Sequence, residues 1–293
     1  MPASGSLRLG PNNPAAFAVE AGLKGWQPSP MADATSTPSH GSKVPHVTLA
    51  FWVVKIAATT LGETAGDALS MTLKLGYVVS TLIFLAIFLV AVTAQIRARQ
   101  FHPFLYWTVI VATTTVGTTM ADFADRSLGI GYVGGSLILF ALVVTVLFVW
   151  WRTEGSVSVD PIQSPRVEAF YWASILASNT LGTALGDFLA DSSGLGYRRG
   201  ALVFAGAILV VALLYRFTSI SRSGLFWAAF ILTRPLGATL GDFLTKPRVT
   251  GGLALGRFSS SAVLAAFMVA CILLTSQRQG GVRERSRVPE PTP

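Results

Sequence analysis

The sequence has few charged residues, one cysteine and three histidines. Only 12% of its 293 residues are charged, whereas a soluble domain carries about 25%. The single Cys271 excludes an intramolecular disulfide, and His40, His46 and His102 lie outside the long apolar runs. Those runs therefore hold no haem-ligating histidine pair, histidine-rich zinc site or Ser-His-Asp triad. Because no glycine-rich phosphate loop is present either, we expect neither an enzyme nor an ATP-driven pump, and no cofactor.

Hydrophobic residues make up 52% of the chain and gather in long runs. The purely apolar runs cover residues 78–95, 133–151, 201–215 and 258–275. About 20 apolar residues cross the roughly 30 Å hydrocarbon core of a bilayer. The sequence therefore predicts an integral membrane protein whose partner is the lipid bilayer. The net charge of +8 comes from basic residues beside these runs, so it does not indicate nucleic-acid binding.

One motif occurs four times: an aliphatic residue, Gly, three variable residues, Gly or Ala, and Asp. The copies are residues 61–67, 116–122, 181–187 and 236–242. An aromatic-Trp pair stands ten residues before the first Gly of each copy, and a Gly-Tyr pair follows the first three copies. Matches at so many positions predict a protein of four repeats.

Each repeat is predicted to form two membrane-spanning helices, which gives an all-α fold of eight spans. The Asp-bearing helices are expected near residues 47–69, 104–124, 169–190 and 225–245. The apolar helices are expected near residues 78–96, 133–151, 200–217 and 258–275.

Five segments follow from this pattern. A disordered tail is predicted over residues 1–46, with Met31 as a candidate alternative translation start. Repeats 1 and 2 occupy 47–151, a cytoplasmic linker 152–168, repeats 3 and 4 169–276, and a basic tail 277–293.

Basic residues predict the orientation. The two tails and the loops after even-numbered spans carry 13 Lys or Arg, whereas the opposite loops carry seven. This bias places both termini in the cytoplasm of a multi-pass inner-membrane protein. Trp52, Trp107, Trp172 and Trp227 open the Asp-bearing helices and are interpreted as anchors at the inner interface.

The acidic residues of the motif lie deep in the membrane in this arrangement. Asp67, Asp122, Asp187 and Asp242 each follow their Trp by 15 residues, or about 22 Å along a helix. A charged side chain at a helix centre costs roughly 2.5–3.5 kcal/mol. We therefore expect the four aspartates to face one another inside the bundle, at one depth, because their helices run in the same direction.

Small residues flank each aspartate in the small-xxx-small pattern that allows helices to pack closely in lipid. They are Gly62 and Gly66, Gly117 and Ala121, Gly182 and Gly186, and Gly237 and Gly241.

Further polar residues are predicted near the aspartates. Glu63 lies one turn before Asp67, close to the midplane. Thr60, Thr115 and Thr180 lie two turns before their aspartates, and Asn179 and Arg234 occur at one equivalent position. Arg234 is a candidate counter-ion of Glu63 or of an aspartate. We expect Lys55 to extend to the inner interface and Asp125 to lie at the outer surface.

The repeat Thr59–Asp67, followed by Leu75–Tyr77, resembles a bacterial membrane-anchored protein family defined by a repeat of unknown function. The resemblance covers residues 47–275 and implies a polytopic inner-membrane protein of four repeats. The fourth copy departs from the pattern with Arg234-Pro235 and a longer loop. The resemblance implies no substrate and no catalytic residue.

Two functions are compatible with this pattern. The first is a secondary transporter of a small cation, with protons as a candidate coupling ion, whose site lies between the four Asp-bearing helices. The second is a membrane scaffold or assembly protein in which the same motifs serve helix packing alone. An intramembrane aspartyl protease is disfavoured because Thr64, Ala184 and Thr239 stand where its signature requires Gly.

Overall fold

The computed structural model describes residues 44–98, 100–159 and 164–285. Most of the predicted N-terminal tail and the last eight residues lie outside these ranges. The described residues form eight long α-helices and no strand. The helices are α2 (Leu49–Asp67), α3 (Gly76–Arg97), α4 (Pro103–Asp122), α5 (Gly131–Glu154), α6 (Pro165–Asp187), α7 (Gly196–Phe217), α8 (Arg222–Thr245) and α9 (Arg257–Arg285).

The eight predicted helices are therefore present. The largest differences in their starts are at α6, which begins at Pro165 with Ser164 as its N-cap, at α7, which begins at Gly196, and at α8, which begins at Arg222. Each of these three helices begins three or four residues before its predicted start. At the C-terminus α9 continues to Arg285, into the segment predicted as a tail.

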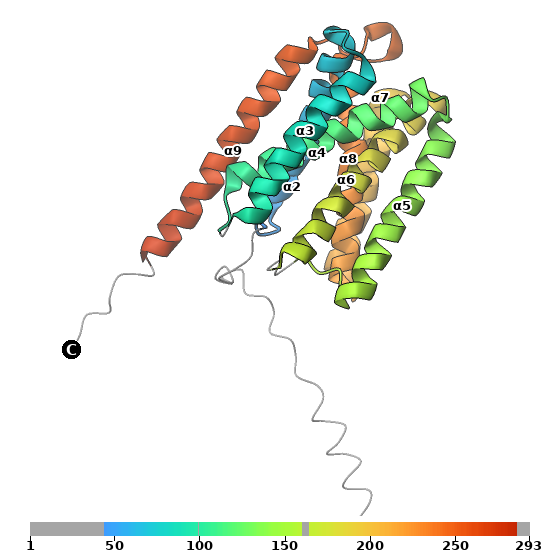
Figure 1. The fold of residues 1–293 in the computed structure, drawn as a ribbon. Helices are drawn as coiled ribbons and strands as arrows, with labels where there is room; N and C mark the ends of the chain where they lie inside the picture. Colours follow the sequence, from blue (N-terminus) through green and yellow to red (C-terminus); the bar gives the residue numbers. More distant parts are fainter. Residues whose placement is uncertain (1–43, 99, 160–163, 286–293) are drawn as a thin grey trace, which may run out of the picture. The chain divides into compact units, whose positions relative to one another are not determined.

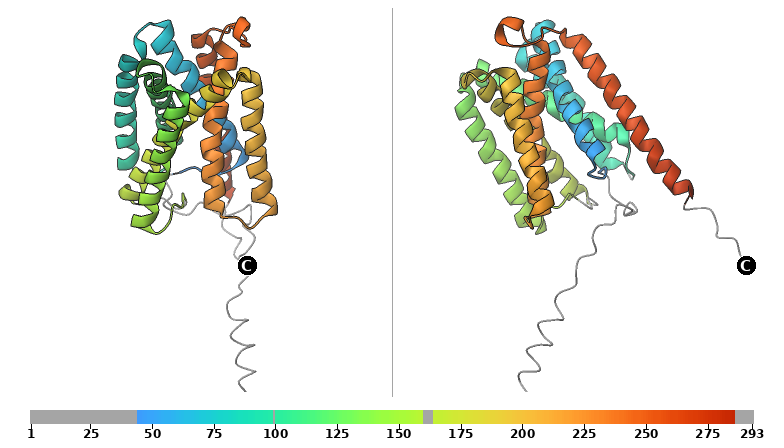
Figure 2. Two further views of the ribbon diagram at one scale, coloured as in Figure 1. Left: turned by 90° about the vertical axis from the view of Figure 1, so that its right-hand side faces the viewer. Right: turned by 180° about the vertical axis from the view of Figure 1, so that it is seen from behind.

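The four Asp-bearing helices form a closed inner ring. Helix α2 packs against α4, α4 against α6, α6 against α8, and α8 against α2 (Figure 1). The apolar helices lie outside this ring, each on the inner helix of the following repeat. Thus α3 packs on α4, α5 on α6 and α7 on α8, and α9 returns to α2 at the edge of the bundle (Figure 2). The repeats are interlocked in a circle by this arrangement.

The same turn connects the inner to the outer helix in each of the first three repeats. A five-residue π-helical turn follows each aspartate, at Ala68–Thr72, Phe123–Ser127 and Phe188–Ser192. The next helix then begins at a glycine with φ of 71–75°. Only glycine adopts this left-handed conformation without strain, which explains the repeated Gly of the Gly-Tyr pair.

Within the described ranges, five helical segments are long and apolar enough to cross a membrane: residues 76–97, 103–127, 131–154, 196–217 and 257–275. Only 17–22% of the most apolar window of the four outer helices is buried in the protein, against 72% for α4. The outer helices thus present apolar side chains outward, as lipid contact requires. The inner helices can carry more polar side chains because the outer helices and the neighbouring inner helices shield them from lipid.

Candidate functional site

Residues four positions apart on each inner helix lie one turn apart and form successive layers across the ring. The first layer comprises Thr59, Thr114, Asn179 and Arg234; the second Glu63, Thr118, Thr183 and Ala238; the third Asp67, Asp122, Asp187 and Asp242. All twelve side chains are buried. The interior of the ring is therefore polar along three consecutive turns.

The motif glycines bring neighbouring inner helices together at these layers. A Cβ on Gly62 would collide with Thr114, and one on Gly237 would collide with Thr59. A Cβ on Gly117 would lie 3.0 Å from backbone atoms of Asn179 and Thr180, which have little freedom to move.

The remaining motif positions make equivalent contacts. Gly182 abuts Arg234, Gly66 abuts Thr118, Gly186 abuts Ala238 and Gly241 abuts Glu63. Ala121 is fully buried. The small residues thus pack against the first and second layers of the next repeat, and they close the circle from repeat 4 to repeat 1.

The third layer is a ring of four aspartates at the ends of the inner helices. Their side chains are only 1–2% exposed. Three basic residues pair with them. Arg126 lies 3.1 Å from Asp122 and 3.6 Å from Asp187.

On the other side of the ring, Lys246 lies 3.4 Å from Asp67 and 3.2 Å from Asp242. Arg257 adds a 3.3 Å contact to Asp67. Lys246 follows the end of α8, and burial alone would lower its pKa. Asp242 and Asp67 outweigh this effect and raise the pKa above its usual value, so the amine stays charged at neutral pH.

Sequence reasoning missed these three basic residues because it assigned them to an outer loop. Arg126 and Lys246 each follow a motif aspartate by four residues. This helical spacing is the signal that could have identified them. Met71 and Asp191 occupy the equivalent positions in the other two repeats, so the basic residues alternate around the ring.

Arg234 lies on the central axis of the ring and contacts all three other inner helices. Its Nη2 donates to Glu63 Oε2 at 3.0 Å and to Thr183 Oγ1 at 2.6 Å, and also to the hydroxyl of Thr118. Its Nη1 donates to the Thr59 carbonyl at 3.4 Å. Arg234 is 0% exposed and Glu63 is 3% exposed. The predicted counter-ion of Arg234 is therefore Glu63.

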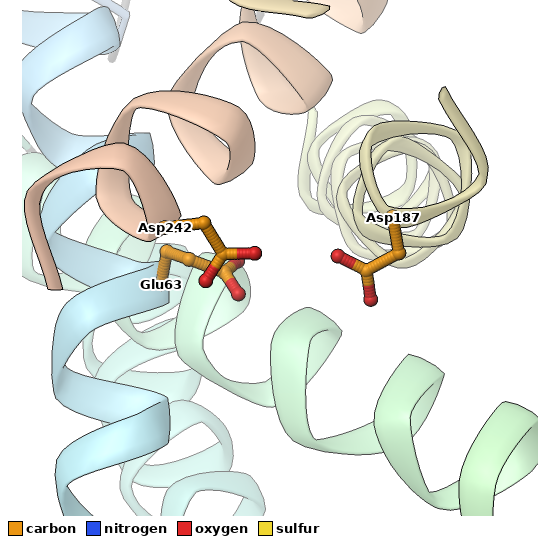
Figure 3. Close-up of side chains that lie close together, drawn as sticks. All are labelled: Glu63, Asp187 and Asp242. Carbon is orange, nitrogen blue, oxygen red and sulfur yellow. The ribbon is translucent and has the colours of Figure 1, made fainter. Parts of the chain in front are cut away.

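Glu63, Asp187 and Asp242 approach one another closely although they come from three different helices. One carboxylate oxygen from each lies within 4.8 Å of the others. Figure 3 shows the three side chains directed toward a common point between α2, α6 and α8. Among the described residues this is the group of acidic side chains that could hold a metal ion, and carboxylate oxygens are the ligands that hard cations prefer.

The threonines and the asparagine that were predicted near the aspartates bond to other groups instead. The hydroxyls of Thr60, Thr115 and Thr180 donate to carbonyls of their own helices, at 2.9, 2.5 and 3.0 Å. The hydroxyls that meet the axial guanidinium belong instead to the second layer. Asn179 is in the first layer, where its Nδ2 donates to Thr113 Oγ1 at 2.9 Å.

Other expectations were wrong. Lys55 does not extend to the interface: it is 0% exposed, with Nζ 4.1 Å from the centre of the Phe230 ring. Asp125 is buried against Gly135 rather than exposed. Trp107, Trp172 and Trp227 are buried in the protein, so they are packing residues rather than lipid-facing anchors.

The opposite end of the axis is filled mainly by aliphatic and aromatic side chains. One turn before the first layer lie Ile110, Ile175, Phe230 and Lys55, all fully buried. One turn further, Phe51 contacts Phe226 and the hydroxyls of Tyr106 and Tyr171 are 2.6 Å apart. These buried side chains fill the end of the ring away from the aspartates.

The family model for a repeat of unknown function, DUF347, matches residues 50–101, 105–156, 170–221 and 225–280. The chain belongs to the DUF347 family. Each DUF347 repeat comprises one inner helix and one outer helix, from α2 with α3 to α8 with α9. The predicted resemblance to a family of fourfold membrane repeats is thus confirmed. Neither the curated proteins nor the solved structures contain a match to this chain.

Proposed function

We propose that this DUF347 protein is a secondary transporter of a small cation, with its site between the four inner helices. In this proposal all eight helices span the bacterial inner membrane and both termini are cytoplasmic. The apolar outer surface of α3, α5, α7 and α9 supports membrane insertion of the whole bundle. The excess of basic residues in the tails and the even-numbered loops supports the orientation.

The observation that carries the proposal is the convergence of five buried carboxylates near one end of the ring. They are Glu63 and the four motif aspartates, and none is more than 3% exposed. Helix packing alone requires no such cluster, because burying each carboxylate costs free energy unless a cation compensates it. A site of this composition attracts cations and excludes anions.

The protein's own basic side chains pair with these carboxylates and therefore compete with a substrate cation for them. Arg126, Lys246 and Arg257 cover the aspartates on the outer side, and Arg234 pairs with Glu63 below them. These four positive groups face five carboxylates, so the closed cluster is one positive charge short of neutrality when every group is ionised.

A substrate cation that enters from the outer side displaces Lys246 or Arg126 from the aspartates. The Phe51 and Tyr106 layer blocks the inner end at that stage, as alternating access requires. Rearrangement of this inner layer would then expose the ion to the cytoplasm.

The test is uptake of Mn²⁺ and of Na⁺ into proteoliposomes that contain the full chain. Asp187→Asn and Glu63→Gln are expected to reduce uptake at least about tenfold, because each removes a charge from the cluster. The matched control is Glu154→Gln, which removes a carboxylate that pairs with Arg166 at 3.4 Å, far from the ring's acidic end. Equal uptake by all variants, or none by the wild type, would contradict the proposal.

A specific observation also favours a scaffold role. The inner helices are in very close contact at Gly62, Gly117 and Gly237, and aromatic side chains fill the end of the ring away from the aspartates. If the motif served only packing, Asp187→Asn would leave the chain folded and function in the cell intact. Loss of function with an unchanged melting temperature would favour transport.

A further inference from the structure

Lys55 is a fully buried amine for which the proposed transport site has no use. It lies on α2, two turns below Glu63, in a layer with Ile110, Ile175 and Phe230. Among the described residues its Nζ has no hydrogen-bond partner. The centre of the Phe230 ring lies 4.1 Å from Nζ.

The ring of Phe230 does not compensate a permanent charge at this position. Attraction between a cation and an aromatic face is weaker than the cost of taking an unpaired ammonium out of water. A lysine in such surroundings changes readily between its charged and neutral forms. The position therefore suits a group that gains and loses a proton as the protein changes state.

The charges around Lys55 come from few groups. From α8, the buried guanidinium of Arg234 lies in the adjacent layer and repels a second positive charge there. The ionisable groups of α4 and α6 nearest along the axis are the hydroxyls of Tyr106 and Tyr171, one turn further in. On α9, Arg257 pairs with Asp67 at the other end of the bundle. Arg234 is thus the charge that controls the proton of Lys55.

Two more unpaired polar atoms lie between Lys55 and the acidic end. They are Arg234 Nε and Asn179 Oδ1, both in the first layer and both without a hydrogen-bond partner among the described residues. Buried polar atoms of this kind are normally satisfied by ordered water. They provide hydrogen-bonding positions along the axis from Lys55 to the pair of Arg234 and Glu63.

We propose that Lys55 is the proton-coupling residue of the transporter: it carries a proton when the acidic cluster holds no substrate cation, and releases it when the cation binds. This inference rests on the proposed function. The link is Arg234, whose Nη2 is 3.0 Å from Glu63 Oε2. When Glu63 turns to a bound cation, the positive charge of Arg234 is no longer neutralised and repels the proton on Lys55. The proton leaves as H⁺ toward water, so cation and proton exchange across the membrane.

The experiment counts protons released as Mn²⁺ binds to the purified full chain, by calorimetry in buffers of different ionisation enthalpy. Wild type is expected to release a proton from Lys55, so that its affinity falls about tenfold for each unit of decreasing pH. Lys55→Met is permanently neutral and is expected to release one proton fewer per ion. Lys55→Gln, a second neutral variant, is measured in case the first does not fold.

Lys55→Arg gives the opposite result, since its charge is permanent and should weaken binding about tenfold or more relative to Lys55→Met at every pH. Ile175→Met is the matched control in the same layer and should leave the proton count unchanged. Equal proton release by wild type and by both neutral variants would overturn the role of Lys55 while leaving the cation site intact. Failure of the wild type to bind or transport Mn²⁺ and Na⁺ would instead contradict the proposed function itself.

Discussion

Replacing Arg234 tests whether the contribution of its guanidinium to the free energy of unfolding depends on Glu63. Arg234 is 0% exposed and donates to Glu63 at 3.0 Å, to Thr183 and to Thr118. Arg234→Met removes these bonds and leaves Glu63 buried beside the other carboxylates. Breaking a buried ion pair by removing one partner costs about 3–5 kcal/mol. Glu63→Gln leaves the guanidinium without its counter-ion and is expected to cost about the same.

The double variant Arg234→Met with Glu63→Gln removes both charges. Independent effects would add to about 6–10 kcal/mol, whereas a neutral, packed replacement of a buried pair is often close to wild type. We therefore expect the double variant within about 2 kcal/mol of wild type, with a coupling free energy of at least about 4 kcal/mol. Equilibrium unfolding of the full chain in mixed micelles measures all four species. Arg198→Met, at an exposed position of α7, is the control. A double variant that loses the full sum would refute the pairing.

Two further predictions concern packing and the outer basic groups. Gly237→Ala places a methyl group against side-chain and backbone atoms of Thr59, and it should lower the free energy of unfolding by about 3 kcal/mol. Gly206→Ala is the control, because open space surrounds Gly206, and it should not lower the free energy of unfolding. Equal melting temperatures for the two variants would contradict the close contact of α8 with α2. Lys246→Met removes the amine between Asp67 and Asp242 and should raise the affinity for Mn²⁺ at least about tenfold, because the ion no longer displaces a tethered charge. Lys74→Met, an exposed lysine on the same side of the bundle, should not change it, and unchanged binding in both variants would exclude competition by Lys246.

The helices and their pairing into repeats were predictable from sequence because apolar length and the repeated motif are local signals. The burial of the aspartates also followed from the cost of exposing them to lipid. Helical spacing alone could not show which neighbouring residues face the axis. It placed Thr60 there, whereas the layers run through Thr59 and Glu63, and the hydroxyl of Thr60 donates to a carbonyl of its own helix.

The circular order of the repeats was not predictable, since no sequence signal says that α9 returns to α2. Lys55 was misjudged for a related reason. Its distance from the helix start suggests that the side chain reaches the interface, but the side of α2 on which it lies is enclosed by the ring. Arg126 and Lys246 were overlooked because a position counted as loop proved to continue the helical path past the aspartate.

The most direct test of a cation site between the inner helices is an electron paramagnetic resonance titration of the full chain with Mn²⁺. The account predicts one bound ion per chain, and loss of that ion when Glu63, Asp187 and Asp242 are replaced together by Gln, Asn and Asn. Equal Mn²⁺ binding by the wild type and the triple variant, with both folded, would contradict it.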